Sequence, residues 1–256
     1  MTQTGPKFSV LGIGVSAVQI GDVVECMQDW IAQRDACHTI AVTGMHGIME
    51  AHHDAAFKDR LKRASLVVPD GMPLVWLARL KGHDLRRRVY GPELMMSFCE
   101  ISAQKGYRHF LYGGVPGVAE KLAVELVNRF PGLVIAGAYS PPFRPVTSEE
   151  DAEMMKMVSA AQPDVLWVGL STPKQERWMD EHHNLLTVPV LVGVGAAFDI
   201  HSGIKKQAPV WMRENGLEWF FRLIQEPKRL WRRYILYGSE FLFWVTLDLL
   251  GLRKYD

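Results

Sequence analysis

The sequence predicts an α/β fold in which a mostly parallel sheet carries helices on both faces and a helical appendage follows at the C-terminus. Through most of the chain, short apolar runs of strand length alternate with segments whose apolar residues recur at helical spacing, which is typical of parallel βαβ units. After about residue 217 no further strand-like run is evident. A chain of 256 residues is long enough to form one such domain around a sizeable core.

Short apolar runs mark the expected strands. The run after Lys7 has the apolar length of a signal-peptide core, but a single basic residue precedes it and Gly12, Gly14 and Gln19 interrupt it, which favours a first strand. The expected strands are Phe8–Ile20, Thr39–Thr43, Leu66–Val68, His109–Tyr112, Leu133–Ala138, Val165–Gly169 and Val188–Val194.

Helices are expected where apolar residues return every three or four positions, as Val23, Met27 and Trp30 do. The expected helices are Ile20–Gln33, a segment from the turn at residues 43–47 through Met49 and Phe57, Pro73–Lys81, Val118–Phe130, Ser148–Gln162 and a helix that begins at Thr172.

The overall charge and the cysteine content restrict the partners and the compartment. The net charge is only +1, so nothing global indicates nucleic acid as a partner, and any basic patch must be local. Cys26, Cys37 and Cys99 are odd in number and have unpatterned spacings, which indicates reduced thiols in a reducing compartment. We therefore expect a cytoplasmic protein.

The stretch Val165–Arg177 is expected to run from a buried strand through a tight turn into a helix that Thr172 caps. Helix N-termini attract anions, and in open parallel sheets ligands bind beyond the carboxyl ends of the strands. The first turn carries Lys174, Gln175 and Glu176, which are therefore candidate ligand-binding residues. Thr-x-x-Gln is also a capping box, in which Gln175 only bonds back to the backbone of Thr172, and the sequence leaves both interpretations open.

Two further turns follow predicted strands. Asp70 comes directly after Leu66–Val68 and Pro69, where it is either a base at a ligand site or only a turn residue, since Pro-Asp-Gly makes good turns. Gly113 and Gly114 lead from a strand into a helix, and glycines let a backbone approach a diphosphate. Their spacing differs from the dinucleotide fingerprint Gly-x-Gly-x-x-Gly, so the signal is weak.

Basic residues concentrate in the C-terminal tail. Between residues 221 and 237 five cations face one acid and alternate with aromatic residues, as expected of an element that lies on an anionic membrane surface. On a continuous helix Arg222, Arg229 and Arg233 would share one side. The apolar run Phe241–Leu252 is too short to span a bilayer, which takes roughly 20 residues. The alternative is an ordinary helix packed on the core or on another subunit.

An earlier basic run, Arg86–Arg88, is either a solvated loop or a phosphate contact.

A set of short motifs occurs together and in order from about Phe8 to Arg233. The motifs are Pro69-Asp70-Gly71, Arg88-Val89-Tyr90-Gly91, Tyr112-Gly113-Gly114, Gly169 with Pro173-Lys174-Gln175-Glu176, Gly193-Val194-Gly195 with Phe198-Asp199, Ala208-Pro209, Gly216-Leu217-Glu218-Trp219 with Arg222-Leu223, and Glu226-Pro227. Each piece is weak alone, but the joint pattern resembles the WecG/TagA/CpsF family of glycosyltransferases.

The resemblance implies a Rossmann-like, inverting glycosyltransferase that moves a sugar from a UDP-sugar to a polyprenyl-diphosphate-linked acceptor in cell-surface polysaccharide biosynthesis. It implies neither a metal nor another cofactor, because the UDP-sugar is a substrate. It divides the chain into a glycosyltransferase domain, residues 1–215, and a membrane-associating appendage, residues 216–256. The protein would lie peripherally on the cytoplasmic face of the membrane, and a homo-oligomer is an open alternative.

An inverting transfer needs a base for the acceptor hydroxyl and hydrogen-bond donors for the departing diphosphate. The resemblance, together with its place at a strand end, makes Asp70 the expected base, and Thr43 and His46 join the expected catalytic set. The expected substrate-binding residues are Gly113, Gly114, Lys174, Gln175, Glu176, Asp199, Arg88, Arg222, Arg229 and Arg232.

Two departures from the family pattern bear on the substrate. Members that use N-acetylmannosamine donors typically have Thr-x-Asn where this chain has Thr43-Gly44-Met45-His46, which leaves the donor sugar open. The loop Ser140–Pro145 replaces the more usual Gly-Tyr-Phe and resembles the capsule and exopolysaccharide branch.

Two other classes of protein are alternatives to a glycosyltransferase. A dinucleotide-dependent oxidoreductase should show Gly-x-Gly-x-x-Gly after its first strand, but Gly12-Ile13-Gly14 continues as Val-Ser-Ala. A non-catalytic membrane scaffold would explain the tail but would leave Asp70 without a role.

Overall fold

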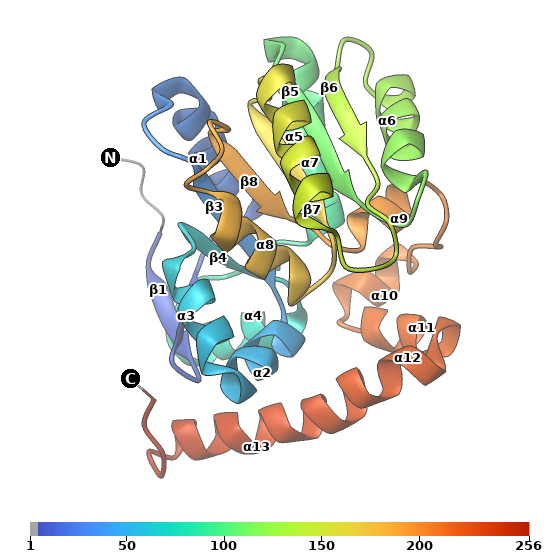
Figure 1. Ribbon diagram of the computed structural model, residues 1–256. Helices are drawn as coiled ribbons and strands as arrows, with labels where there is room; N and C mark the ends of the chain where they lie inside the picture. The colour runs from blue at the N-terminus through green and yellow to red at the C-terminus, as the bar shows by residue number, and fades with distance from the viewer. Residues whose placement is uncertain (1–4, 256) are drawn as a thin grey trace.

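The structure, a computed structural model that describes residues 5–255, is organised around a six-stranded parallel sheet with the strand order β4-β3-β8-β7-β5-β6 (Figure 1). Helices cover both faces, which confirms the predicted fold class. The strands of this sheet are β3 (His38–Thr43), β4 (Leu66–Pro69), β5 (Arg108–Gly113), β6 (Val134–Tyr139), β7 (Val165–Gly169) and β8 (Val190–Gly193).

The helices before the tail alternate with these strands. They are α1 (Ile20–Gln33), α2 (Met45–His53), α3 (Ala55–Arg63), α4 (Met72–Leu80), α5 (Gly91–Lys105), α6 (Val118–Arg129), α7 (Ser148–Ala161), α8 (Lys174–His182), α9 (Ala197–His201) and α10 (Val210–Glu214).

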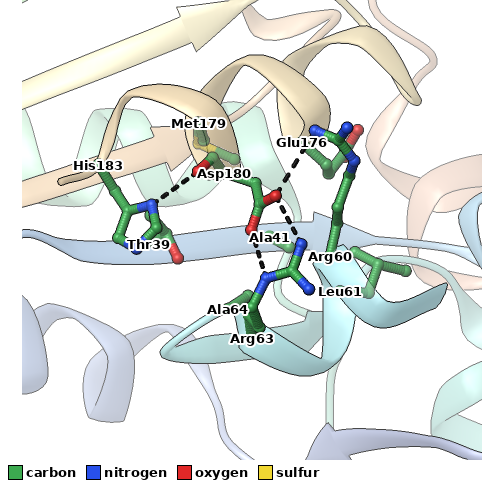
Figure 2. A pocket seen from close by; sticks show the side chains of 10 residues that line it. All are labelled: Thr39, Ala41, Arg60, Leu61, Arg63, Ala64, Glu176, Met179, Asp180 and His183. Carbon is green, nitrogen blue, oxygen red and sulfur yellow. Dashed lines mark hydrogen bonds and ion pairs between the residues drawn. The ribbon is translucent and has the colours of Figure 1, made fainter. Parts of the chain in front are cut away.

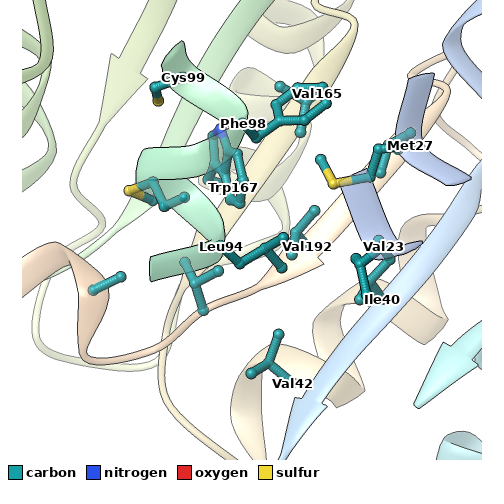
Figure 3. Close-up of a cluster of buried hydrophobic side chains, with 14 of the residues drawn as sticks. Val23, Met27, Ile40, Val42, Leu94, Phe98, Cys99, Val165, Trp167 and Val192 are labelled. Atoms are coloured by element: carbon teal, nitrogen blue, oxygen red, sulfur yellow. The ribbon is translucent and has the colours of Figure 1, made fainter. Parts of the chain in front are cut away.

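The core consists of two layers, one on each face of the sheet. On one face, α1 and α5 bury apolar side chains against the strands; Figure 3 labels Val23, Met27, Leu94, Phe98, Ile40, Val42, Trp167 and Val192 among them. On the other face, α7 and α8 cover β5 and β7. Because both faces are covered, the central strands are apolar throughout, as is typical of parallel sheets.

The segment Phe8–Ile20 is not a single strand of the main sheet. It forms an antiparallel hairpin of β1 (Lys7–Val10) and β2 (Ile13–Ser16). The hairpin turns at Leu11 and Gly12, whose φ angles are 50° and 81°. Gly12 was interpreted only as an interruption of a signal-peptide-like apolar run, but it supplies the left-handed conformation that this turn requires.

Two of the helix predictions also need correction. The helix expected to run through Met49 and Phe57 is broken at Asp54, which is extended and accepts a hydrogen bond from Phe57 N at 3.1 Å as the cap of α3. Helix α5 was missed. It begins with Gly91-Pro92, and a proline in a first turn loses no helical hydrogen bond.

The tail forms α11 (Glu218–Gln225), α12 (Pro227–Trp231), the π-helical turn η1 (Arg232–Leu236) and α13 (Tyr237–Leu249). The helix is interrupted at Glu226, so the prediction that the three arginines share one side of a continuous helix was wrong. Helix α13 packs along α2, with Phe241 and Val245 buried against the hairpin side of the domain (Figure 1). Within residues 5–255, no helix has the length and apolarity needed to cross a bilayer.

Candidate active site

The carboxyl ends of β3, β4, β7 and β8 lie side by side at one edge of the sheet, and several sequence motifs meet there. Asp70 N donates to Thr43 O at 2.9 Å, and a Cβ on Gly44 would lie 2.4 Å from the Asp70 carbonyl oxygen. A Cβ on Gly47 would lie 2.9 Å from Thr43 Cγ2 and 3.5 Å from Thr172 Cγ2. Residues from three different loops are therefore immediate neighbours.

Buried polar atoms that have no hydrogen-bond partner among the described residues gather around this edge. Six of them belong to the end of β3, to the segments that follow β3, β4 and β7, or to the tail: Thr43 Oγ1, His46 Nδ1, Asp70 Oδ1, Gln175 Oε1, Glu176 Oε2 and Arg233 Nε. Unpaired buried polar groups cost free energy and are rare in folded proteins. We call these six residues the polar cluster, and it is a candidate site for a polar ligand.

Asp70 belongs to a charged network. Arg88 Nη1 lies 3.6 Å from Asp70 Oδ1, beyond hydrogen-bond distance, while Arg88 Nη2 pairs with Glu218. The Tyr90 hydroxyl donates to Glu218 Oε1 at 2.8 Å. Burial raises the pKa of Asp70 to about 6, although the positive charge of Arg88 opposes the shift. A carboxyl group with this pKa is ionised at neutral pH and still basic enough to accept a proton.

His46 lies on the first turn of α2. Burial and the positive charge of Arg233 lower the pKa of His46 to about 3, so the ring is neutral at physiological pH. Its Nε2 lies 3.4 Å from Glu50 Oε1, and its Nδ1 belongs to the polar cluster. A neutral imidazole can exchange hydrogen bonds with a ligand, but it does not supply positive charge to a diphosphate.

The start of α8 does not form the capping box, which was one of the two interpretations that the sequence left open. Pro173 is the N-cap, and no side chain among the described residues caps this helix. The Thr172 hydroxyl donates to Glu176 Oε1 at 2.8 Å, and Gln175 Nε2 donates to the same oxygen at 3.0 Å. The capping-box interpretation of Gln175 was therefore wrong. Gln175 and Glu176 are both buried, and burial raises the pKa of Glu176.

Two glycines after or within β8 make room for Gln175. A Cβ on Gly193 would lie 3.0 Å from Gln175 Nε2. Gly195 has a φ of +48°, and a Cβ there would lie 3.4 Å from Gln175 Oε1. The Gly193-Val194-Gly195 motif thus has a physical reason, because larger residues would displace a side chain of the polar cluster.

Gly113 and Gly114 lie at the end of β5, four strand spacings from β4, which is roughly 19 Å at about 4.8 Å for each spacing. A Cβ on Gly113 would lie 2.6 Å from the Gly169 backbone, and one on Gly114 would lie 2.6 Å from Val118 Cβ. Both glycines therefore have a packing role. They lie far from Asp70, but β5 is next to β7, after which Gln175 and Glu176 follow, so an elongated ligand could reach from Asp70 toward these glycines.

Two of the tail arginines, Arg222 and Arg233, face the polar cluster, and we call them the inner arginines. Both are partly buried, and both positive charges act on Asp70. Arg233 acts in addition on His46 and Glu176, so it lies among three members of the polar cluster. An anion bound there would meet two cations that already lack much of their solvation.

Arg229 and Arg232 are exposed, and we call them the outer arginines. Arg229 pairs with Glu226, and the Arg232 guanidinium lies 5.4 Å from the centre of the Trp231 ring. The structure thus separates residues that the sequence grouped as substrate-binding, because these two are exposed whereas Arg222 is partly buried.

Lys174 and Asp199 also lie outside the polar cluster. Lys174 is exposed at the first position of α8. Asp199 pairs with Lys205 at 2.7 Å, and Lys205 also lies 3.4 Å from Glu226 of the tail. This lysine therefore connects the loop after α9 to the end of α11.

A hollow between α3 and α8, beside Glu176, is bordered by ion pairs (Figure 2). Arg63 donates two hydrogen bonds to Asp180, at 2.7 and 2.8 Å, and Arg60 lies 3.5 Å from the same carboxylate and 2.7 Å from Glu181. These pairs hold the helix that carries Gln175 and Glu176 against α3. The Asp180 carboxylate already has two cationic partners, so it offers a bound cation little that is unpaired.

Sequence reasoning gave no role to Glu218 or Tyr90 and assigned Arg233 to a membrane surface. Glu218 is buried, and it pairs with Arg88 and Tyr90 across 128 or more positions of the chain. The sequence signal for this role was Glu218 itself, an acidic residue between apolar neighbours at the start of the basic tail. Its motif had been quoted only as part of the family resemblance.

Comparisons with known proteins identify the family to which the chain belongs. The sequence model of the Glycosyl transferase WecG/TagA/CpsF family matches residues 8–255. The chain is 33% identical over 186 residues to the N-acetylglucosaminyldiphosphoundecaprenol N-acetyl-beta-D-mannosaminyltransferase of Bacillus subtilis (strain 168), which covers 71% of this chain and 70% of the relative. It is 28% identical over 227 residues to a protein of the same name from Staphylococcus aureus (strain MW2), which covers 88% of this chain and 87% of that relative.

Proposed function

Because the chain belongs to the WecG/TagA/CpsF family of glycosyl transferases, we propose that it transfers a sugar from a UDP-sugar, with inversion, to a polyprenyl-diphosphate-linked saccharide. The observation that carries this proposal is the polar cluster around Asp70, which unites an ionisable carboxyl group with unpaired hydrogen-bonding atoms and a cation. The relatives' names specify an acceptor sugar on diphosphoundecaprenol, which supports the same class of acceptor here.

Asp70 is the proposed general base. In an inverting transfer the acceptor oxygen forms a bond to the anomeric carbon while the bond from that carbon to the diphosphate oxygen breaks. The proton of the acceptor hydroxyl passes to Asp70, and the bonding electrons leave with UDP. A pKa near 6 suits this task, because the base is ionised at neutral pH and holds the proton once the hydroxyl gives it up.

The inner arginines are the proposed partners of the departing diphosphate. Negative charge builds up on the leaving group in the transition state, and fixed cations in a partly buried site stabilise it strongly. Arg222 and Arg233 meet this need because both act on Asp70 from the tail. Arg88 also lies near Asp70, but it is already paired with Glu218 and serves in this proposal to orient the carboxyl group.

The outer side of the tail is the proposed membrane contact at the cytoplasmic face. The tail exposes large apolar side chains, which include Trp219, Phe220, Ile224, Trp231, Ile235 and Phe243, and the Trp231 ring lies next to Arg232. Aromatic and basic residues together suit the interface of an anionic leaflet. The assignment of the product to capsule or exopolysaccharide rests only on the resemblance of the Ser140–Pro145 loop to that branch of the family.

The test is a transfer assay with the full chain, a panel of UDP-sugars and a short-chain polyprenyl-diphosphate saccharide. We expect release of UDP together with a product one sugar longer, whose new linkage has the opposite anomeric configuration to the donor. Calorimetry should detect binding of UDP. Absence of both UDP binding and turnover would refute the proposal, and retention of configuration would refute the single-displacement mechanism.

A further inference from the structure

His46 presents an unused hydrogen-bonding atom to the polar cluster. Its Nδ1 is buried and has no hydrogen-bond partner within residues 5–255. Its other nitrogen, Nε2, faces the Glu50 carboxylate at 3.4 Å, and its ring lies 5.6 Å from that of Tyr237 on α13. Contacts with α2 and with the tail therefore hold the ring on one side, while Nδ1 remains an unpaired atom of the polar cluster.

The protonation state of His46 decides what Nδ1 can do. The lowered pKa means that the ring carries one proton at neutral pH. A carboxylate facing Nε2 favours the tautomer with that proton on Nε2, because the alternative would set a nitrogen lone pair against the negative charge of Glu50. Nδ1 is then a hydrogen-bond acceptor.

The neighbours of His46 in the polar cluster are also mostly acceptors. Gln175 donates its amide N–H to Glu176, which leaves Gln175 Oε1 as an acceptor. The free oxygens of Asp70 and Glu176 accept when ionised. Thr43 Oγ1 can donate or accept a hydrogen bond, and Arg233 Nε is the cationic donor. A ligand in this space must therefore supply mainly donors.

Hydroxyl groups of a sugar meet that requirement, because each one brings an O–H donor. An N-acetyl group in place of a hydroxyl keeps one donor, its amide N–H, but adds a carbonyl acceptor and a methyl group. The carbonyl would compete for the few donors present, and the added bulk would move the N–H from the place of the hydroxyl. Sites built to bind a hydroxyl discriminate strongly against analogues that leave their buried polar atoms unpaired.

We propose that the transferred sugar is a hexose with a free hydroxyl facing His46 Nδ1, and that His46 selects it over an N-acetylated hexosamine. This inference rests on the proposed UDP-sugar transferase function. It separates the chain from the relatives described above, which are named for transfer of N-acetylmannosamine.

The first experiment compares donors with the wild-type full chain. UDP-glucose, UDP-galactose, UDP-N-acetylglucosamine and UDP-N-acetylmannosamine are each assayed with the same short-chain polyprenyl-diphosphate saccharide. We expect kcat/KM for the better hexose donor to exceed that for the better N-acetylated donor by at least about 10-fold. A preference for an N-acetylated donor would overturn the inference while upholding the proposed function. Turnover of none of the four together with no binding of UDP would overturn both.

The second experiment tests His46 itself. His46→Asn places an amide that can donate to a carbonyl, so the ratio of kcat/KM for hexose over N-acetylated donor should fall by about 10-fold. His183→Asn is the matched control, because His183 lies at the far end of α8 and contacts the Asp180 backbone oxygen at 2.8 Å. Its ratio should equal that of the wild type. Equal losses for both donors in His46→Asn, at an unchanged melting temperature, would contradict the selective role.

Discussion

The inner and outer arginines of the tail lie within 12 positions of one another, yet the fold gives them different surroundings. Arg222 and Arg233 are partly buried and act on Asp70. Arg229 and Arg232 are exposed beside Glu226 and Trp231. The interruption at Glu226-Pro227 separates Arg222 on α11 from the three later arginines, and among those three only Arg233 is partly buried. One basic stretch can thus serve a reaction centre on one side and a surface on the other.

The sharpest test of the polar cluster that the inner arginines face is Asp70→Asn. This substitution keeps the size and the turn propensity of the side chain but removes its basicity. Turnover should fall by about 10² or more, the usual range for a general base. Binding of UDP by calorimetry and the melting temperature should hardly change. Near-normal turnover would remove Asp70 from the role of base and leave the polar cluster without a catalyst.

Neutralisation of the inner arginines should give the next largest effect. Arg222→Gln and Arg233→Gln should each lower kcat with a short soluble acceptor by about 10-fold to 10²-fold, because each removes a cation from the departing diphosphate. Arg229→Gln and Arg232→Gln are the matched controls and should keep kcat within about twofold with the same acceptor, since both are exposed. Equal losses in all four variants would abolish the distinction between the two sides.

The pH dependence should follow Asp70. Its pKa of about 6 predicts that kcat/KM falls below that pH and approaches a tenfold loss for each further unit. The folded-state pKa lies above the ordinary value of 3.8, so the native state binds this proton more tightly than the unfolded chain does. The stability contributed by this group therefore declines as pH rises from about 4 to 6, and its protonation does not unfold the protein. At pH 5, circular dichroism should thus show a folded protein, and the assay should show a reduced kcat/KM.

The sequence predicted the sheet well because buried parallel strands are continuous apolar runs, as Val165–Gly169 shows. It failed where one residue changes the chain direction: Gly12 turns a hairpin and Asp54 separates two helices. Such positions have several conformations of similar energy, and only tertiary packing selects among them.

In the site, the residues at strand ends were found because parallel topology gathers the carboxyl ends at one edge. Asp70 and Gln175 were identified for this reason. The pairing of Glu218 with Arg88 was missed because it joins segments 130 positions apart. The position of Arg233 was missed because a continuous helix was assumed through Pro227, where α12 begins.

The tail also contributes to the fold of the domain expected at residues 1–215. Phe241 and Val245 are buried against the cluster that contains the hairpin and α2, and Glu218 pairs with Arg88. Phe241→Ala should lower the free energy of unfolding by about 3–5 kcal/mol, the range for a buried phenylalanine. Chemical denaturation measures this loss, and Phe243→Ala, at an exposed site on the same helix, is the control.

The smallest expected effect concerns the outer side. Each cation near an anionic leaflet contributes about 1 kcal/mol to binding, so Arg232→Gln should weaken partition onto phosphatidylserine-containing vesicles about fivefold. The loss should shrink as salt is raised, because the attraction is screened over about 10 Å at 0.1 M salt. Lys156→Gln, an exposed cation on α7, should leave partition unchanged because α7 lies away from the tail (Figure 1). Neither substitution should alter kcat with a soluble acceptor. If Arg232→Gln slowed that reaction while vesicle binding stayed the same, this outer arginine would belong with the inner pair, and the tail would have one functional side.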